Sequence, residues 1–294
     1  NASYAWVGSR DLPYRYSEFP TTMADDHMIA VWWEQPGSPV ILDGTTFSHS
    51  MADVPAFIQG KECLIEKGPD NYMLYTIPVA AVNRNQIYDS LSIELRGDTV
   101  TGHGVAQFTG ESRADMISRF EGKDSTEWKN IVRDALNRIS NKVTITQIRI
   151  LENPDADAPF TLEYHVVIPD YLVKTNKSSY INLNLSRYLQ QTRIKDDRKI
   201  PVEAEMAHSY RFVCAFRVPD GYSVLQLPEG SAYEDPAFGF RETYSRNNEQ
   251  VVLKSDVVIN FLVINGKELS SYQQMLSLLN RNYAKSLQLE KTDI

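Results

Sequence analysis

Hydrophobic and polar residues alternate along most of the chain in short runs, as they do in strands with one buried face. The alternation is clearest in SLSIEL (90–95) and YRFVCAFRV (210–218), where apolar residues recur at every second position. Gly, Pro and Asn cluster between such runs and indicate turns between short antiparallel strands. Further strand-like runs begin with YAWVG (4–8), HMIAVWW (27–33), PVILD (39–43), ECLIE (62–66) and YMLYTI (72–77).

Three segments instead repeat apolar residues at spacings of three and four, which predicts helices. Residues 111–121 place Met116 and Phe120 on one side, and residues 125–140 begin with Ser125 as the expected N-cap. The second segment carries an apolar stripe that we expect to pack on a sheet: Trp128, Ile131, Val132, Ala135, Leu136 and Ile139. A third helix is expected near 270–285, with Tyr272, Met275, Leu276, Leu279 and Tyr283 on one side.

The predicted fold class is α+β, mostly β, with an antiparallel β-sandwich and accessory helices near 111–140 and 270–285. A length of 294 residues with 42% hydrophobic residues suits one large domain or two ordinary ones. Turn signals at KGPDN (67–71) and VNRNQ (82–86) favour a boundary near residue 78, which divides the chain into residues 1–78 and 79–294. A further division near 155–175 is left open.

Charge and composition exclude several classes of function. The net charge is −8 and no dense basic run occurs, so we expect no nucleic-acid partner. No run of eighteen apolar residues is present, so no membrane span is expected in this chain. Cys63 and Cys214 lie far apart without metal-ligand spacing, and we expect no metal, no cofactor and no disulfide framework.

His27 and Asp43 are the candidate catalytic residues. The histidine heads one strand-like run and the aspartate ends the next, with the turn EQPGS between them. If the two runs pair as antiparallel neighbours, these side chains meet at one edge, where cross-strand Cβ atoms lie about 4.5–5.5 Å apart. A cysteine nucleophile needs such an imidazole and a carboxylate that orients it. The spacing alone also fits a solvated strand end.

Four motifs resemble the latter part of a bacterial transglutaminase-like catalytic domain, within the papain-like cysteine peptidase superfamily. They lie in the first part of the chain: AWVGSRDLPYRY (5–16), DDHMIA (25–30), ILDGTT (41–46) and VPAFIQGKECLI (54–65). The resemblance implies that His27 is the catalytic histidine and Asp43 the aspartate that orients it. Departures from the usual pattern are Asp26 in place of Asn, which adds a negative charge beside the imidazole, and Gly44 in place of Ala.

The resemblance also implies where the nucleophile lies. The family's cysteine precedes the AWVGS motif, and the first residues already read as a strand, so we expect a cut or processed N-terminus and a cysteine in an N-terminal remainder of the same protein. Cys63 and Cys214 sit in apolar runs, where buried thiols react poorly. This chain alone is therefore expected to be inactive.

The implied activity of the complete protein is acyl transfer from protein or peptide amides, in a secreted, periplasmic or cell-envelope location. Hydrolysis and amine transfer both remain open. A second hypothesis is a non-catalytic module that binds protein or glycan at the cell envelope. Glycoside hydrolysis is a third, but no pair of acids is indicated by the spacing.

Residues beyond about 80 resemble the β-rich region that follows such catalytic domains, for which no activity is implied. A basic cluster is interpreted as a solvated loop, and an aromatic cluster as a loop pinned to the sandwich, with ligand binding left open for both. The clusters are Arg193, Lys195, Arg198 and Lys199, and Tyr233, Phe238, Phe240 and Tyr244. The remaining histidines are interpreted as structural: His49, His103, His165 and His208.

Overall fold

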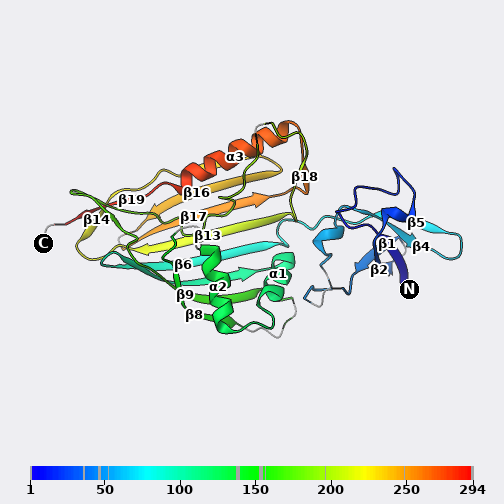
Figure 1. Cartoon of the computed structure of the whole chain (residues 1–294), viewed down its shortest axis with the longest axis horizontal. Helices are drawn as coiled ribbons and strands as arrows, with labels where there is room; N and C mark the ends of the chain where they lie inside the picture. Colours follow the sequence, from blue (N-terminus) through cyan, green and yellow to red (C-terminus); the bar gives the residue numbers. More distant parts are fainter. Residues whose placement is uncertain are drawn as a thin grey trace.

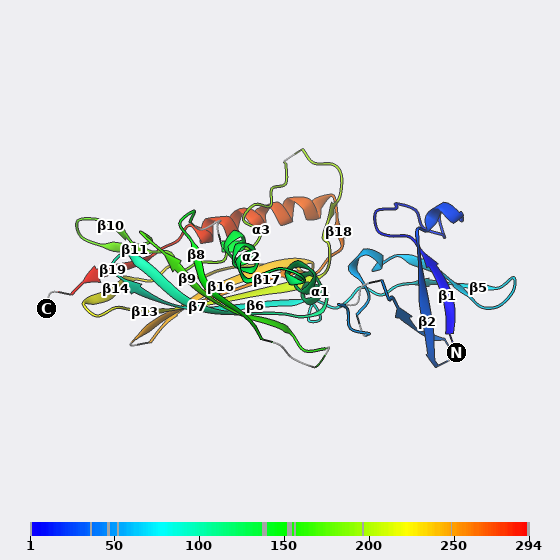
Figure 2. The same ribbon diagram turned by 60° about the horizontal axis from the view of Figure 1, so that its bottom comes forward.

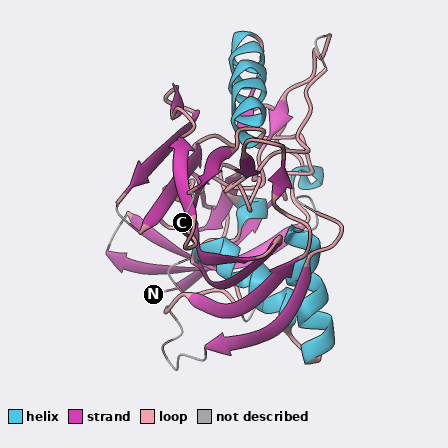
Figure 3. Ribbon diagram, turned by 90° about the vertical axis from the view of Figure 1, so that its left-hand side faces the viewer, coloured by secondary structure: helices cyan, strands magenta, loops and turns pink. Residues whose placement is uncertain are grey.

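The computed structural model describes residues 2–35, 37–45, 48–51, 53–136, 140–151, 155, 157–195, 197–247 and 249–292. Two main sheets lie toward opposite ends of an elongated molecule, a small one near the N-terminus and a large one in the rest of the chain (Figure 1). Strands make up more of the regular structure than helices (Figure 3). The predicted fold class, α+β and mostly β, is confirmed.

The first sheet has five antiparallel strands in the order β3-β2-β1-β4-β5. In chain order the strands are β1 Ala2–Val7, β2 His27–Gln35, β3 Ser38–Leu42, β4 Glu62–Glu66 and β5 Tyr72–Thr76. A separate small core, which includes Val7, Ile29 and Ile65, packs on its inner face under the short helix η2 (Ala56–Ile58). The short helix η1 (Thr22–Ala24) lies in the connection between β1 and β2.

The second sheet has eight strands in the order β15-β16-β17-β13-β6-β7-β9-β8. All its pairs are antiparallel except β6 with β13, which are parallel. Its strands come from both before and after residues 155–175, so one sheet extends across the place where a further division was left open. In chain order they are β6 Gln86–Arg96, β7 Thr99–Phe108, β8 Thr144–Leu151, β9 Phe160–Ile168, β13 His208–Arg217, β15 Ser231–Glu234, β16 Phe238–Arg246 and β17 Gln250–Ile259.

Three helices formed by the described residues pack on the large sheet: α1 Gly110–Phe120, α2 Ser125–Leu136 and α3 Lys267–Tyr283 (Figure 2). Helices are therefore confirmed at all three predicted places, although Ile139 of the predicted stripe lies outside the described residues. None of the described helices is long and apolar enough to cross a membrane.

Short strands complete the C-terminal part. A four-stranded sheet has the order β10-β11-β19-β14, and β12 pairs with β18. Their bounds are β10 Val173–Lys174, β11 Ser179–Ile181, β12 Val202–Glu203, β14 Tyr222–Gln226, β18 Val263–Ile264 and β19 Leu287–Lys291. Side chains from this small sheet, such as Ile181 and Leu289, share one core with the large sheet and the three helices. The division near residue 78 stays a prediction.

The start of helix α2 differs from the prediction. Asp124, not Ser125, is the cap, because its Oδ1 accepts hydrogen bonds from the backbone N–H groups of Thr126 at 2.8 Å and Glu127 at 2.9 Å. The Glu127 carboxylate accepts a hydrogen bond from the Asp124 N–H in return, at 2.9 Å. This reciprocal arrangement is a capping box, and it places Ser125 in the first turn.

The aromatic cluster of residues 233–244 is not a loop, and this interpretation was wrong. Tyr233 lies on β15, and the other three residues lie on β16, where Phe238 and Phe240 point into the core. The apolar alternation of β16 is interrupted in the sequence because the next inward position is Glu242, which is 1% exposed. Its carboxylate accepts hydrogen bonds from Asn184 at 2.9 Å and from the Tyr244 hydroxyl at 3.1 Å.

Candidate functional site

His27 and Asp43 lie side by side at one end of the β2–β3 pair. Antiparallel pairing of Ala30 with Leu42 brings the first residue of β2 and the residue after β3 to the same edge. The Nε2 atom of His27 is 2.8 Å from Oδ2 of Asp43. The Asp43 side chain is 1% exposed and that of His27 is 17% exposed, so the contact is shielded from solvent on the aspartate side. The structure thus brings the two candidate residues together, whereas their catalytic role stays a prediction.

Thr45 holds the Asp43 carboxylate from the other side. Its backbone N–H and its hydroxyl both donate to Oδ1 of Asp43, at 3.0 and 2.5 Å. Burial on its own raises the pKa of Asp43, but the hydrogen bonds from Thr45 and His27 outweigh burial and leave this pKa below its ordinary value. Sequence reasoning missed Thr45, although an Asp followed two residues later by Thr is the signal of an Asx turn.

An ionised Asp43 determines which imidazole nitrogen carries the proton. Because the carboxylate accepts only, neutral His27 donates through Nε2 and keeps the lone pair on Nδ1. No hydrogen bond within the described part of the chain involves that Nδ1 atom. The Phe57 ring lies beside the imidazole in an edge-type contact, with 5.2 Å between ring centroids. The contact with Asp43 thus leaves the basic Nδ1 nitrogen of the imidazole directed away from the carboxylate, which is the geometry that a general base requires.

The Asp26 carboxylate binds Ser9. Its two carboxylate oxygens accept hydrogen bonds from the backbone N–H and the hydroxyl of Ser9, at 2.7 and 2.8 Å. The hydrogen bond from the Ser9 N–H is the largest cause that lowers the pKa of Asp26. Asp26 therefore fixes the segment that follows β1 against the start of β2.

Cys63 shares the inner face of the sheet with His27 but cannot reach it. Val7 of β1 pairs with His27 on one side and with Cys63 on the other, so a whole strand separates the two residues. Two strand spacings amount to about 9–10 Å. Cys63 is fully buried, and burial raises the pKa of its thiol to about 12. Cys214 is equally buried, in the core of the large sheet.

Two basic residues of the motifs hold the surrounding loops. The Arg10 guanidinium donates to the backbone carbonyls of Ala204 and Glu205, at 2.5 and 2.6 Å, and so joins the first part of the chain to the second. The Lys61 ammonium donates to the carbonyls of Leu12 and Tyr14, at 2.5 and 2.9 Å. These motif residues shape the site rather than enter it.

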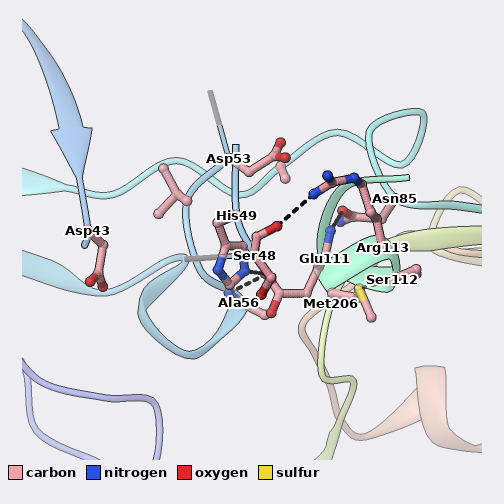
Figure 4. A network of polar contacts seen from close by, with 12 residues as sticks. Asp43, Ser48, His49, Asp53, Ala56, Asn85, Glu111, Ser112, Arg113 and Met206 are labelled. Atoms are coloured by element: carbon pink, nitrogen blue, oxygen red, sulfur yellow. Dashed lines mark hydrogen bonds and ion pairs between the residues drawn. The ribbon is translucent and has the colours of Figure 1, made fainter. Parts of the chain in front are cut away.

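The loop that follows Asp43 is anchored on helix α1 (Figure 4). The Nε2 atom of His49 lies 2.9 Å from the Glu111 carboxylate, which also accepts a hydrogen bond from the Ala56 N–H at 3.1 Å. Arg113 donates to the Ser48 carbonyl at 2.7 Å. The hydrogen bond to Glu111 is the largest cause that raises the pKa of His49. The sequence indicated His49 only as a loop residue, because its partner lies 62 positions away.

The other singled-out residues are not brought to this site. His103 and His165 pair across β7 and β9, with ring centroids 4.8 Å apart, and both are exposed. His208 lies 2.5 Å from the Tyr188 hydroxyl. Arg193 and Arg198 of the basic cluster donate to backbone carbonyls of their own loop. No group of three or more His, Cys, Asp and Glu side chains that could hold a metal ion occurs among the residues that the structure describes.

Comparisons with known proteins give limited similarity. A family model described as "Domain of Unknown Function with solved-structure structure (DUF3858)" matches residues 177–289, less than half of the chain. No curated protein matches the sequence. A crystal structure from Parabacteroides distasonis, described as that of "a putative protease", is similar with a TM-score of 0.48 and 8% sequence identity. The alignment covers 98% of this chain and 40% of that one. The transglutaminase-like assignment stays a prediction.

Proposed function

We propose that this chain carries the histidine and the aspartate of a transglutaminase-like cysteine peptidase or acyltransferase site. The observation that supports the proposal is the 2.8 Å contact between His27 Nε2 and the buried Asp43 carboxylate. Thr45 keeps that carboxylate ionised, and Nδ1 of His27 has no hydrogen-bond partner among the described residues. The family assignment rests on the resemblance of the sequence motifs around both residues. The same resemblance implies that a cysteine is the nucleophile.

In the proposed reaction, Nδ1 of His27 takes the proton of a cysteine thiol, and the thiolate attacks the carbonyl carbon of a protein or peptide amide. The imidazolium then protonates the leaving amine nitrogen as the carbon–nitrogen bond breaks, which leaves a thioester. Attack on the thioester by water completes hydrolysis, and attack by an amine completes transfer. Asp43 stays ionised throughout and stabilises the imidazolium.

The nucleophile is proposed to lie in an N-terminal remainder of the same protein, in a secreted, periplasmic or cell-envelope location. Both cysteines of this chain are buried, so neither is available. The outer face of the first sheet is exposed and apolar, and a patch of this kind usually marks an interaction site. It includes Tyr4, Trp6, Met28, Trp32, Tyr72 and Leu74. We propose that the N-terminal remainder covers this face.

The test is peptide turnover by the parent protein that includes the N-terminal remainder. His27→Ala and Asp43→Asn should each lower kcat/KM by about a thousandfold to ten-thousandfold, because the base or its orientation is lost. His103→Ala is the matched control. His103 is an exposed histidine on β7 of the large sheet, whereas His27 is on the first sheet, so this variant should leave turnover unchanged. Full activity in the His27→Ala variant would refute the proposal.

The exposed apolar face also favours a second candidate, a non-catalytic module that binds another protein. The two candidate functions differ in whether the outer face of the first sheet is covered or exposed to solvent in the parent protein. Quenching of tryptophan fluorescence by acrylamide should be weaker in the parent if the N-terminal remainder covers Trp6 and Trp32. Equal quenching in the parent and in this chain, together with no peptide turnover, would favour the binding module.

A further inference from the structure

A cavity of about 300 Å³ lies between helices α1 and α2 and the inward face of the large sheet. Helices α1 and α2 lie over this part of the sheet in Figures 1 and 2. The size falls at the lower end of small-molecule sites, which span roughly 300–1,000 Å³. Most of the wall is apolar, with side chains that include Ile87, Phe108, Met116, Ile131, Val132 and Leu162. None of the described lining residues belongs to the first sheet, so the cavity is separate from His27 and Asp43.

One carboxyl group faces this apolar cavity. Asp89 of β6 pairs with Ala106 of β7, which in turn pairs with Leu162 of β9, so the three side chains lie in a row on one face. The small side chain of Ala106 leaves room beside the carboxyl group. Asp89 is 8% exposed and lines the cavity. Its Oδ1 accepts a hydrogen bond from the Tyr164 hydroxyl at 2.9 Å, and its Oδ2 has no partner among the described residues.

A glycine lets Tyr164 reach Asp89. Gly104 of β7 lies between Leu91 of β6 and Tyr164 of β9 in the strand register. The Tyr164 ring crosses β7 at this position, so that a Cβ atom on residue 104 would overlap the ring and the hydroxyl. The hydroxyl group thereby reaches one strand further, to Asp89. Three neighbouring strands thus contribute a glycine, a tyrosine and an acid to one polar position.

Burying the Asp89 carboxyl group costs free energy that an apolar residue at the same position would not. Burial raises the pKa of Asp89 to about 7, and a single hydrogen bond from Tyr164 offsets only part of the loss of hydration. Replacing both partners of a buried hydrogen bond by apolar groups of the same shape can be nearly neutral or stabilising. A buried acid with one unused oxygen in an apolar cavity is therefore characteristic of a ligand site.

The remaining polar groups lie around the same cavity. The hydroxyls of Ser186 and Tyr210 are hydrogen-bonded to each other, and the Tyr188 ring stacks on Tyr210 with 4.6 Å between centroids. Arg187 and Arg119 also line the cavity, and the Arg119 side chain is 52% exposed. One of these two hydroxyls donates to the other, and no described residue donates to Oδ2 of Asp89.

We propose that this cavity binds a small molecule with an apolar body and one hydroxyl or amino group, which donates a hydrogen bond to Oδ2 of Asp89. The apolar wall receives the body of the molecule, and the carboxyl group orients it. A ligand that lacks the donor leaves Oδ2 of Asp89 without a partner. An anionic ligand is repelled by the Asp89 carboxylate. The proposal is independent of the function proposed for His27 and Asp43.

Four probes of similar shape test the proposal: benzyl alcohol, benzylamine, toluene and benzoate. Binding to this chain is measured by titration of methyl NMR signals, with Met116, Ile131 and Leu162 as reporters of the cavity. Benzyl alcohol or benzylamine should bind at least about tenfold more tightly than toluene and benzoate, since an unpaired buried acceptor is costly. Binding of none of the probes, shifts confined to other places, or equal affinity for toluene and benzyl alcohol would overturn the proposal.

A pair of variants assigns the effect to Asp89. Asp89→Leu should abolish the preference for benzyl alcohol over toluene. Glu242→Met is the matched control, because Glu242 is also a buried acid of the large sheet but does not line the cavity, and it should keep the preference. A preference that survives in a folded Asp89→Leu variant overturns the proposal. If that variant does not fold, the comparison of the four probes on the unmodified chain still decides.

Discussion

At the scale of the residue, chemistry depends on which groups are buried together. Asp43 and Asp89 are both shielded from solvent, yet the pKa of the first is lowered and that of the second is raised. Asp43 receives hydrogen bonds from Thr45 and His27, whereas Asp89 receives one from Tyr164. The balance between burial and hydrogen-bond donors therefore keeps the pKa of Asp43 below its ordinary value and raises that of Asp89.

The two cysteines should be inert while the chain is folded. Burial raises the pKa of the Cys63 thiol to about 12, so little of the reactive thiolate is present at neutral pH. Iodoacetamide should label neither Cys63 nor Cys214 in the native chain, and both in denaturant, as measured by mass spectrometry. Ser118→Cys, an exposed position on α1, is the positive control. Rapid native labelling of Cys63 would contradict the buried position.

At the scale of the element, local signals inside the chain begin and end the helices. At α2, the Asp124 carboxylate accepts backbone N–H groups of the first turn, the Glu127 carboxylate accepts the N–H of Asp124, and Arg133 lies in the last turn. Strands depend more on their neighbours. β16 forms because Phe238 and Phe240 pack against the core, and Phe238 lies 4.9 Å from the Tyr272 ring of α3.

Loss of the α2 cap should destabilise the C-terminal part measurably. Asp124→Ala removes the acceptor of two backbone N–H groups, and we expect the free energy of unfolding to fall by about 1 kcal/mol. Ser125→Ala is the matched control and should have almost no effect, because Ser125 is not the cap. Urea unfolding followed by circular dichroism measures both. A larger effect for Ser125→Ala than for Asp124→Ala would restore the sequence-based assignment of the cap.

At the scale of the whole molecule, described residues after Asp43 are held by helix α1, which packs on the large sheet. His49 and Ala56 both contact Glu111 of α1, and Arg113 holds Ser48. Arg10 forms a second connection, to the carbonyls of Ala204 and Glu205. The positions of Ser48, His49 and Ala56 therefore depend on the C-terminal part of the chain.

The contact between His49 and Glu111 should stabilise the chain in a pH-dependent way. The pKa of His49 is raised in the folded state. The contribution of protonated His49 to the free energy of unfolding is therefore complete below the unfolded pKa of about 6.5, and it is lost as pH rises through the folded pKa. Glu111→Gln should lower the free energy of unfolding by about 1.5–3 kcal/mol at acidic pH. The difference from the unmodified chain should shrink as pH rises from about 6 to about 9.

The control for this pH dependence is Glu163→Gln, which breaks the ion pair with Arg149. Arginine does not titrate in this range, so the effect of Glu163→Gln should not change between about pH 6 and about pH 9. Urea unfolding at several pH values measures both variants. An effect of Glu111→Gln that is equally constant would show that His49 does not titrate against Glu111.

Local periodicity in the sequence predicted the three helices and strands such as β2, β6 and β13, because alternation and the three–four spacing are properties of neighbouring residues. The motifs also nominated His27 and Asp43, whose strands are adjacent in the chain. Only the tertiary structure decided the partners that come from distant segments. Glu111 for His49, Tyr164 for Asp89 and Asn184 for Glu242 lie 62, 75 and 58 positions away. Buried polar contacts of this kind depend on which strands become neighbours, and no local pattern specifies that pairing.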